Sequence, residues 1–254
     1  MKVQRIRLSE NGKVTWIVLG DDLLPVEPIQ QYLSYLESLE KSPNTIKSYA
    51  YHLMLFWEFV QASKLDWRNV PLERRADFIH WLRSPDPKVI HLHPVQARRT
   101  ERTVNTIMTA VNSFYEFQER LGTVEKVETN HYQYQGRQKY KSLLHHVNKN
   151  KPVRKSLLKL KEPKIFPGTL TDPQVKQLLK ACNRVRDKLL ICLLYETGMR
   201  IGEALGLRHE DVYSMGQNEI HVIPRINNLN SARSKSGIER VIHVSKELMS
   251  LYSE

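Results

Sequence analysis

The sequence contains few cysteines and no long apolar run, and each shortage excludes a class of protein. Only Cys182 and Cys192 occur among the 254 residues. Their spacing fits no zinc pattern, so we expect reduced core thiols rather than a disulfide framework or a zinc site. No apolar stretch approaches the ~20 residues that cross a bilayer, and the segment Met1-Lys-Val-Gln-Arg lacks the apolar core of a secretory signal. These absences predict a protein of the reducing cytoplasm that makes no membrane contact.

Acidic residues are also in short supply. Asp and Glu total 27 against 39 Lys and Arg, which gives a net charge of +12 and a pI near 9.6. Such an excess favours a polyanionic partner, because cations that contact phosphates release condensed counterions. A basic soluble protein without a nucleic-acid partner is the alternative. The hydrophobic share of 41% is enough for packed cores and excludes wholesale disorder.

The pattern along the chain predicts a mainly α protein with small β parts. Residues 3–19 alternate in the manner of a β-hairpin around Asn11-Gly12, so 1–25 forms an N-terminal hairpin. Two interpretations of it are open, an accessory DNA-contacting arm and a structural appendage. Residues 26–122 show helical periodicity and predict a four-helix bundle, with helices that include 72–83 and 100–121 and a C-terminal cap at Gly122.

A strongly basic segment follows the predicted bundle. Residues 137–164 hold ten Lys or Arg and one acid, Glu162, and prolines interrupt them. We interpret 123–165 as an extended basic linker, which either tracks a DNA backbone or serves as a solvated tether. Residues 166–254 then predict an α+β domain. Its helix starts at Thr171-Asp172-Pro173, and 219–223 and 240–244 predict two strands of a hairpin.

The segment 195–212 is the most informative part of the chain. An apolar helix ends at Gly198, Arg200 opens the next helix, and Glu203 follows one turn later, within i,i+3 reach. A guanidinium stays charged and its planar fork matches two phosphate oxygens. Glu203 would fix the arginine or the helix start by hydrogen bonds. The alternative is an ordinary helix-end cation.

This segment, with Leu205, Leu207, Asp211 and Val212, resembles the first catalytic box of the tyrosine recombinases, the phage integrase family. His209 departs from that pattern, which often has tryptophan there. The resemblance implies that a tyrosine hydroxyl attacks a DNA phosphodiester to give a 3′-phosphotyrosine while a 5′ hydroxyl leaves. Arg200 would stabilise charge on the nonbridging oxygens. The reaction implies no nucleotide cofactor, and no metal-ligand cluster is visible.

The turn Ser234-Lys235-Ser236-Gly237 resembles the family's hairpin with its mobile lysine. That resemblance implies that Lys235 protonates the departing 5′ oxygen as a general acid. A loop lysine that contacts phosphate is the alternative, and Arg233 is a neighbour that fits either part. The loop 227–232 is longer than usual for the family.

The family's second box, a His-x-Leu-Arg-His-type helix, and its nucleophilic tyrosine have no match after Lys235. The segment His80-Trp-Leu-Arg83 matches the first four residues of that box, but it precedes Arg200 instead of following it. Tyr252 lies too near the hairpin to be the nucleophile. We therefore expect an incomplete catalytic domain that does not complete the chemistry alone, and we leave open whether this chain is an enzyme.

The segment Asn44-Thr-Ile-Lys47-Ser-Tyr49 resembles the opening of the family's core-binding domain, which clasps one face of the duplex. The side chains near the predicted helix starts and in the linker either meet phosphates and base edges or are solvated surface residues. The candidate DNA-contacting residues are Lys47, Arg98, Arg99, Arg102 and Asn105 in the bundle, and Lys139, Lys141, Arg154, Lys155 and Lys159 in the linker.

The leading hypothesis is a site-specific recombinase or transposase of the tyrosine type that acts on double-stranded DNA. The resemblance also implies self-association on DNA as a tetrameric synapse. Two alternatives are a non-catalytic DNA-binding protein that occupies recombination sites and an RNA-binding basic protein. A preference for duplex DNA over structured RNA separates the last of these from the others.

Overall fold

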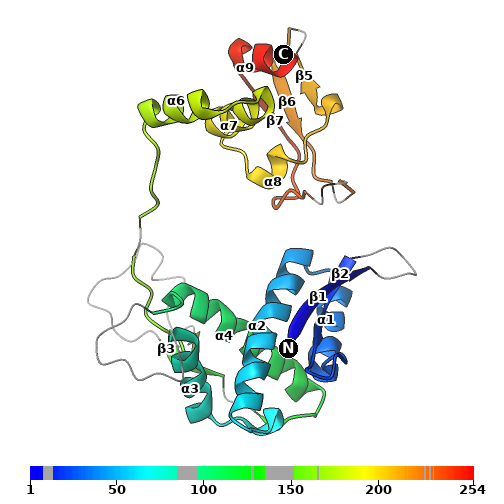
Figure 1. Ribbon diagram of the computed structural model, residues 1–254, viewed down its shortest axis with the longest axis vertical. Helices are drawn as coiled ribbons and strands as arrows, with labels where there is room; N and C mark the ends of the chain where they lie inside the picture. The colour runs from blue at the N-terminus through cyan, green and yellow to red at the C-terminus, as the bar shows by residue number, and fades with distance from the viewer. Residues whose placement is uncertain are drawn as a thin grey trace. The chain divides into compact units, whose positions relative to one another are not determined.

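The computed structural model describes the chain except for residues 8–13, 85–96, 127–128, 135–151, 165, 215, 226, 229 and 231. The chain divides into two compact units, residues 1–165 (unit 1) and residues 166–254 (unit 2). Both combine helices with small sheets (Figure 1), which confirms the predicted fold class. Among the described helices, none combines the length and apolar character needed to cross a bilayer.

Unit 1 is built on a helical bundle. Its second helix begins where the Ser42 hydroxyl accepts a hydrogen bond from the Thr45 amide, directly before Pro43 at the first helical position. The last helix begins in the same way at Thr100. The core is formed by the inner faces of these helices and is rich in aromatic rings such as Phe56 and Phe114. The elements are α1 (Glu27–Ser38), α2 (Pro43–Ala62), η1 (Trp67–Asn69), α3 (Leu72–Arg83) and α4 (Glu101–Arg120).

The N-terminal hairpin packs directly on this bundle. Strands β1 (Lys2–Arg7) and β2 (Val14–Leu19) are antiparallel, and Val3 pairs with Val18. Val18 is 1% exposed and belongs to the bundle core, and β2 lies against α1 and α2 (Figure 1). The hairpin and the helices therefore share one core, although the sequence analysis divided them at residue 25. The predicted turn at Asn11-Gly12 lies outside the described residues.

Part of the predicted linker is also folded onto unit 1. Strands β3 (Asn130–Tyr134) and β4 (Pro152–Ser156) pair as an antiparallel ribbon. Beyond β4, Leu158 and Leu160 pack against the bundle core. The prediction of an extended linker throughout 123–165 missed these features for two reasons. The ribbon joins segments that are distant in sequence, and the two inward-facing leucines lie among many charged residues that dominate the sequence pattern.

Unit 2 contains a three-stranded antiparallel sheet with the order β5-β6-β7. The predicted hairpin is confirmed, with Ile220 opposite Ile242, and a short third strand joins its edge. Helix α9 contacts α7, and Leu193, Ile220 and Leu248 meet in a separate core. The elements are α6 (Asp172–Ala181), α7 (Val185–Thr197), α8 (Ile201–Ala204), η2 (His209–Asp211), β5 (Val212–Tyr213), β6 (Glu219–Val222), β7 (Arg240–His243) and α9 (Lys246–Ser253).

Candidate functional site

The site begins at the turn between α7 and α8. Gly198 ends α7 with φ of 61°, and its amide donates to the Leu194 carbonyl at 3.1 Å. A side chain would be strained in this left-handed conformation, which explains the glycine. Met199 then enters the core at 4% exposed. Arg200 follows directly and forms the N-cap of α8.

Glu203 fixes the start of α8 from inside. Its Oε2 accepts a hydrogen bond from the Arg200 amide at 3.0 Å, which satisfies a backbone donor that the helix itself leaves unpaired. Its Oε1 lies 3.4 Å from Nη1 of Arg200. The two side chains differ in exposure, since Arg200 is 60% exposed and Glu203 is 0% exposed. Arg200 is therefore anchored by its backbone while most of its side chain stays open to solvent.

The same carboxylate also accepts hydrogen bonds from a distant part of the chain. Nη2 of Arg240, on β7, donates to Oε2 at 2.7 Å. The hydroxyls of Ser234 and Ser236 each donate to Oε1 at 3.2 Å. The hydrogen bond from Arg240 is the main reason why the pKa of Glu203 falls to about 2, although burial opposes ionisation. Glu203 is thus held ionised at the centre of a hydrogen-bond cluster.

Lys235 lies between these two serines and is exposed. The turn continues through Gly237, whose φ of 60° is left-handed. Upstream, Nδ2 of the Asn230 side chain donates to the Leu205 carbonyl at 2.7 Å, and Nδ2 of the Asn228 side chain donates to the Ala232 carbonyl at 3.0 Å. Through Glu203, the structure brings the start of α8 at Arg200 and the turn that carries Lys235 together.

A second charged pair supports the loop that follows β6. Nη1 and Nη2 of Arg225 each donate to one oxygen of the Asp211 carboxylate, both at 2.6 Å. The Arg208 amide donates to the same carboxylate at 2.9 Å. Burial of Asp211 opposes ionisation, but the hydrogen bonds from Arg225 and Arg208 lower its pKa. The sequence analysis missed Arg225. The sequence pointed to it only indirectly, because the motif contains an acid, Asp211, that needs a cation from another part of the chain.

The candidate cations of unit 1 have different surroundings. Lys47 and Arg98 are exposed, and the Arg102 side chain is 87% exposed with its Nε 3.7 Å from Glu162. Arg99 instead donates from Nη1 to the Leu82 carbonyl at 3.0 Å. Arg99 is thus engaged in joining α3 to the start of α4, whereas the other three present their charge to solvent.

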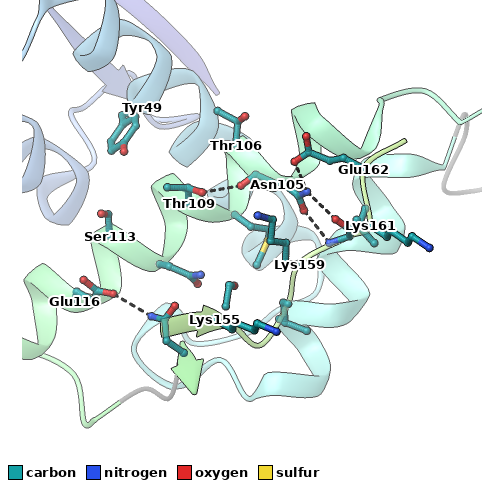
Figure 2. A pocket seen from close by; sticks show the side chains of 16 residues that line it. Tyr49, Asn105, Thr106, Thr109, Ser113, Glu116, Lys155, Lys159, Lys161 and Glu162 are labelled. Carbon is teal, nitrogen blue, oxygen red and sulfur yellow. Dashed lines mark hydrogen bonds between the residues drawn. The ribbon is translucent and has the colours of Figure 1, made fainter. Parts of the chain in front are cut away.

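Asn105 joins α4 to the basic segment beyond β4. Its Oδ1 accepts from the Leu160 amide at 2.8 Å, and its Nδ2 donates to the Leu160 carbonyl and to Glu162, both at 2.9 Å. Figure 2 shows these hydrogen bonds beside a groove. The prediction gave Asn105 a contact with DNA, but in this structure both ends of its amide are engaged with the chain itself.

The groove next to Asn105 has a volume of about 1160 Å³ and runs between α4 and the segment 155–162. Lys155 and Lys159 line it and are exposed (Figure 2). Arg154 lies in β4, where only its backbone is described. Lys139 and Lys141 lie outside the described residues. Across the described part of the chain, no group of three or more His, Cys, Asp and Glu side chains is placed to hold a metal ion.

Comparison with known families matches both units. Residues 29–122 match the phage integrase N-terminal SAM-like domain, and residues 168–254 match the phage integrase family. Transposase A from transposon Tn554 of Staphylococcus aureus is 44% identical over 255 residues, which cover 100% of this chain and 70% of that protein. Tyrosine recombinase XerA of Pyrococcus horikoshii is 26% identical over 230 residues, which cover 90% of this chain and 60% of that protein.

Solved structures share the fold. The Tn1549 transposon integrase in complex with a circular intermediate DNA superposes with a TM-score of 0.54 at 15% identity, over 89% of this chain and 63% of that one. The same integrase with transposon right end DNA gives a TM-score of 0.52 at 16% identity, with the same coverage of both chains. At these identities the likeness concerns the fold alone.

Proposed function

Because the chain belongs to the phage integrase family of tyrosine recombinases, we propose that it acts on double-stranded DNA in site-specific recombination or transposition. Its part in the reaction is to bind the duplex and to supply Arg200 and Lys235 to the strand-cleavage site. One observation carries this proposal: the buried carboxylate of Glu203 binds both the Arg200 backbone and the serines that flank Lys235. The two backbone segments that carry these cations, distant in sequence, are thus bound to one carboxylate.

The charge balance of the cluster leaves Arg200 available for an anion. Glu203 carries one negative charge, and Arg240 holds it most closely, at 2.7 Å against 3.4 Å for the Arg200 guanidinium. Charge-assisted hydrogen bonds strengthen as they shorten, so Arg240 satisfies the carboxylate. Arg200 is the more exposed of the two arginines, 60% against 37%. Its role is to bind the nonbridging oxygens of the scissile phosphate, where charge increases in the transition state.

Lys235 has the complementary role of the proton donor. Its exposed position on the turn allows its ammonium group to approach the 5′ oxygen that leaves during cleavage. Transfer of its proton to that oxygen avoids an alkoxide leaving group. This role rests on the family resemblance of the turn, and the docking of the turn on Glu203 supports it.

Unit 1 supplies the sequence-independent part of DNA binding. The exposed cations Lys47, Arg98, Arg102, Lys155 and Lys159 are proposed to contact phosphates, which would give affinity that falls steeply with salt. The predicted contacts of Lys139, Lys141 and Arg154 belong to the same proposal. Arg99 and Asn105 support this surface from within the protein. Self-association of the protein on DNA, in a tetrameric synapse, is proposed from the family.

The test measures binding to a mixed-sequence DNA duplex over a range of salt concentrations. We expect a steep linear fall of log K with log salt, with a slope of about −0.9 for each phosphate contacted, and preference for this duplex over a structured RNA. Arg200→Ala should make the slope shallower by the value of about one phosphate contact, whereas Arg200→Lys should leave the slope unchanged. Arg186→Ala is the matched control, because Arg186 is exposed in the same unit and already paired with its neighbour Asp187. Binding without salt dependence, or an unchanged slope in Arg200→Ala, contradicts the proposal.

A further inference from the structure

The two serines beside Lys235 face the opposite way from the lysine. Ser234 and Ser236 are half-buried, and Lys235 between them is exposed. The chain bends at Lys235 and Ser236, and both hydroxyls face the same acceptor. Both donate to Oε1 of Glu203 at 3.2 Å, and they lie 3.1 Å from each other. One carboxylate oxygen therefore holds the turn on both sides of Lys235.

The backbone of the same turn also approaches α8 closely. A methyl group added at Gly202 would come within 2.4 Å of the Arg233 carbonyl oxygen, which is too close for any real side chain. The absence of a side chain on Gly202 is therefore required for the turn to lie where the serines reach Glu203. This contact is independent of the two hydroxyls, and it indicates docking of the whole segment.

Arg240 fixes the orientation of the acceptor. Its Nη2 donates to Oε2 of Glu203 at 2.7 Å, and its Nη1 lies 3.4 Å from Oε1. The Arg200 amide also donates to Oε2. With Oε2 occupied in this way, Oε1 remains directed at the serines. The carboxylate cannot rotate without breaking a charge-assisted hydrogen bond, so the serines find the acceptor in place.

We propose that Ser234 and Ser236 are positioning residues that clamp the turn onto Glu203 and thereby present the Lys235 amino group next to Arg200. The inference rests on the proposed function for the role of Lys235, but the clamp itself is a property of this chain. Its benefit is preorganisation: the conformational entropy of the turn is lost when the protein folds, and not when DNA binds. The clamp therefore strengthens the Lys235 contact and adds no phosphate contact of its own.

The first experiment measures how fast trypsin cleaves after Arg233 and Lys235 in the whole chain. A docked turn resists the protease, because cleavage requires local opening. We expect the double variant Ser234→Ala/Ser236→Ala to be cleaved there at least ten-fold faster, with a melting temperature close to that of the wild type. The conservative variant Ser234→Thr/Ser236→Thr keeps both hydroxyls and should restore slow cleavage. Ser250→Ala, at an exposed position in the same unit, is the control for loss of a serine hydroxyl.

A second variant displaces the turn while both hydroxyls remain. Gly202→Ala introduces the clash with the Arg233 carbonyl and should also accelerate cleavage after Arg233 and Lys235. Gly168→Ala is its control, since a methyl group there meets nothing within 4 Å. Wild-type cleavage rates in the double serine variant overturn the proposal. So does an equal acceleration at all trypsin sites of unit 2, because the hydroxyls would then support overall stability only.

The third readout separates positioning from direct contact. Affinity for a mixed-sequence duplex should fall several-fold in the double serine variant with an unchanged salt slope, whereas Lys235→Ala should reduce the slope by about one contact. A reduced slope in the serine variant overturns the proposal, because the serines would then act on phosphate directly. If the wild type does not bind duplex DNA, the proposed function is wrong, and the cleavage rates still decide whether the clamp exists.

Discussion

Arg225 and Asp211 form a bidentate ion pair, in which Nη1 and Nη2 of Arg225 each lie 2.6 Å from a different oxygen of the Asp211 carboxylate. The Asp211 side chain is 1% exposed and that of Arg225 is 14% exposed. Asp211 ends η2, and Arg225 follows β6 on the way to the Lys235 turn. The pair therefore joins the two segments that bracket the candidate site, and it does so with the fork geometry that only arginine provides.

The first prediction concerns this pair. Arg225→Ala removes both hydrogen bonds and leaves the Asp211 carboxylate buried without its main partner, so we expect a loss of about 3 kcal/mol in the free energy of unfolding. Urea denaturation followed by circular dichroism measures it. Arg186→Ala, which breaks an ion pair between exposed side chains, should cost less than about 1 kcal/mol. Equal losses in both variants would contradict a supporting role for Arg225.

The second prediction is the acid sensitivity of the Glu203 cluster. The folded pKa of Glu203 is about 2 against an ordinary value of 4.5, so ionised Glu203 stabilises the folded state. That contribution is fully present above pH 4.5 and is lost as the pH falls from about 4.5 towards about 2. Glu203→Gln should be less stable than the wild type at pH 7, and the difference should shrink through this window. Urea denaturation at a series of pH values measures the difference. A stability difference that stays constant with pH would contradict the stabilising role of ionised Glu203.

The third prediction concerns His52 in α2. Burial lowers its pKa below the ordinary value of 6.5, and among the described residues its buried Nδ1 has no hydrogen-bond partner. The unfolded chain binds a proton more readily than the folded one, so the free energy of unfolding should fall as the pH drops below about 6.5. His52→Gln cannot titrate and should flatten this part of the pH profile. Thermal melting between pH 5 and pH 8 measures it, and an identical slope in the variant would show that other groups cause the effect.

The fourth prediction tests the anchoring of the basic segment by Asn105. Asn105→Ala removes three hydrogen bonds to Leu160 and Glu162, which should cost about 1–3 kcal/mol. The segment should detach locally, so trypsin should cleave faster after Lys159 and Lys161. Asn112→Ala alters another residue that lines the same groove and should leave the cleavage rate unchanged. Affinity for duplex DNA should also fall, because Lys155 and Lys159 would lose their fixed positions.

The turn at Arg200 shows which contacts a short sequence pattern can predict. Gly198 bonds to Leu194 four residues before it and Arg200 bonds to Glu203 three residues after it, and the geometry of helix ends determines such contacts. The sequence therefore predicted a glycine cap, an arginine at the start of a helix and an acid within reach of it. The same reasoning located the strand pair of unit 2.

The partners of Glu203 were beyond that reasoning. Ser234, Ser236 and Arg240 lie 31, 33 and 37 residues along the chain from it. A residue pattern states that a buried carboxylate needs donors, but it does not state which of the many serines and arginines supply them. The path of the chain after β6 makes that choice. Asn105 and Leu160, 55 residues apart, give the same lesson in unit 1.

The sequence by itself determined the fold class, the family and the two cations on which the proposed chemistry depends, because helix caps, periodicity and the motif 195–212 are short-range features. Only the tertiary structure decided that the N-terminal hairpin joins the bundle core, that part of the predicted linker is a β ribbon, and that one carboxylate holds both Arg200 and the Lys235 turn. These arrangements depend on which distant surfaces exclude water together and which buried charges find partners. Both are properties of the folded chain as a whole.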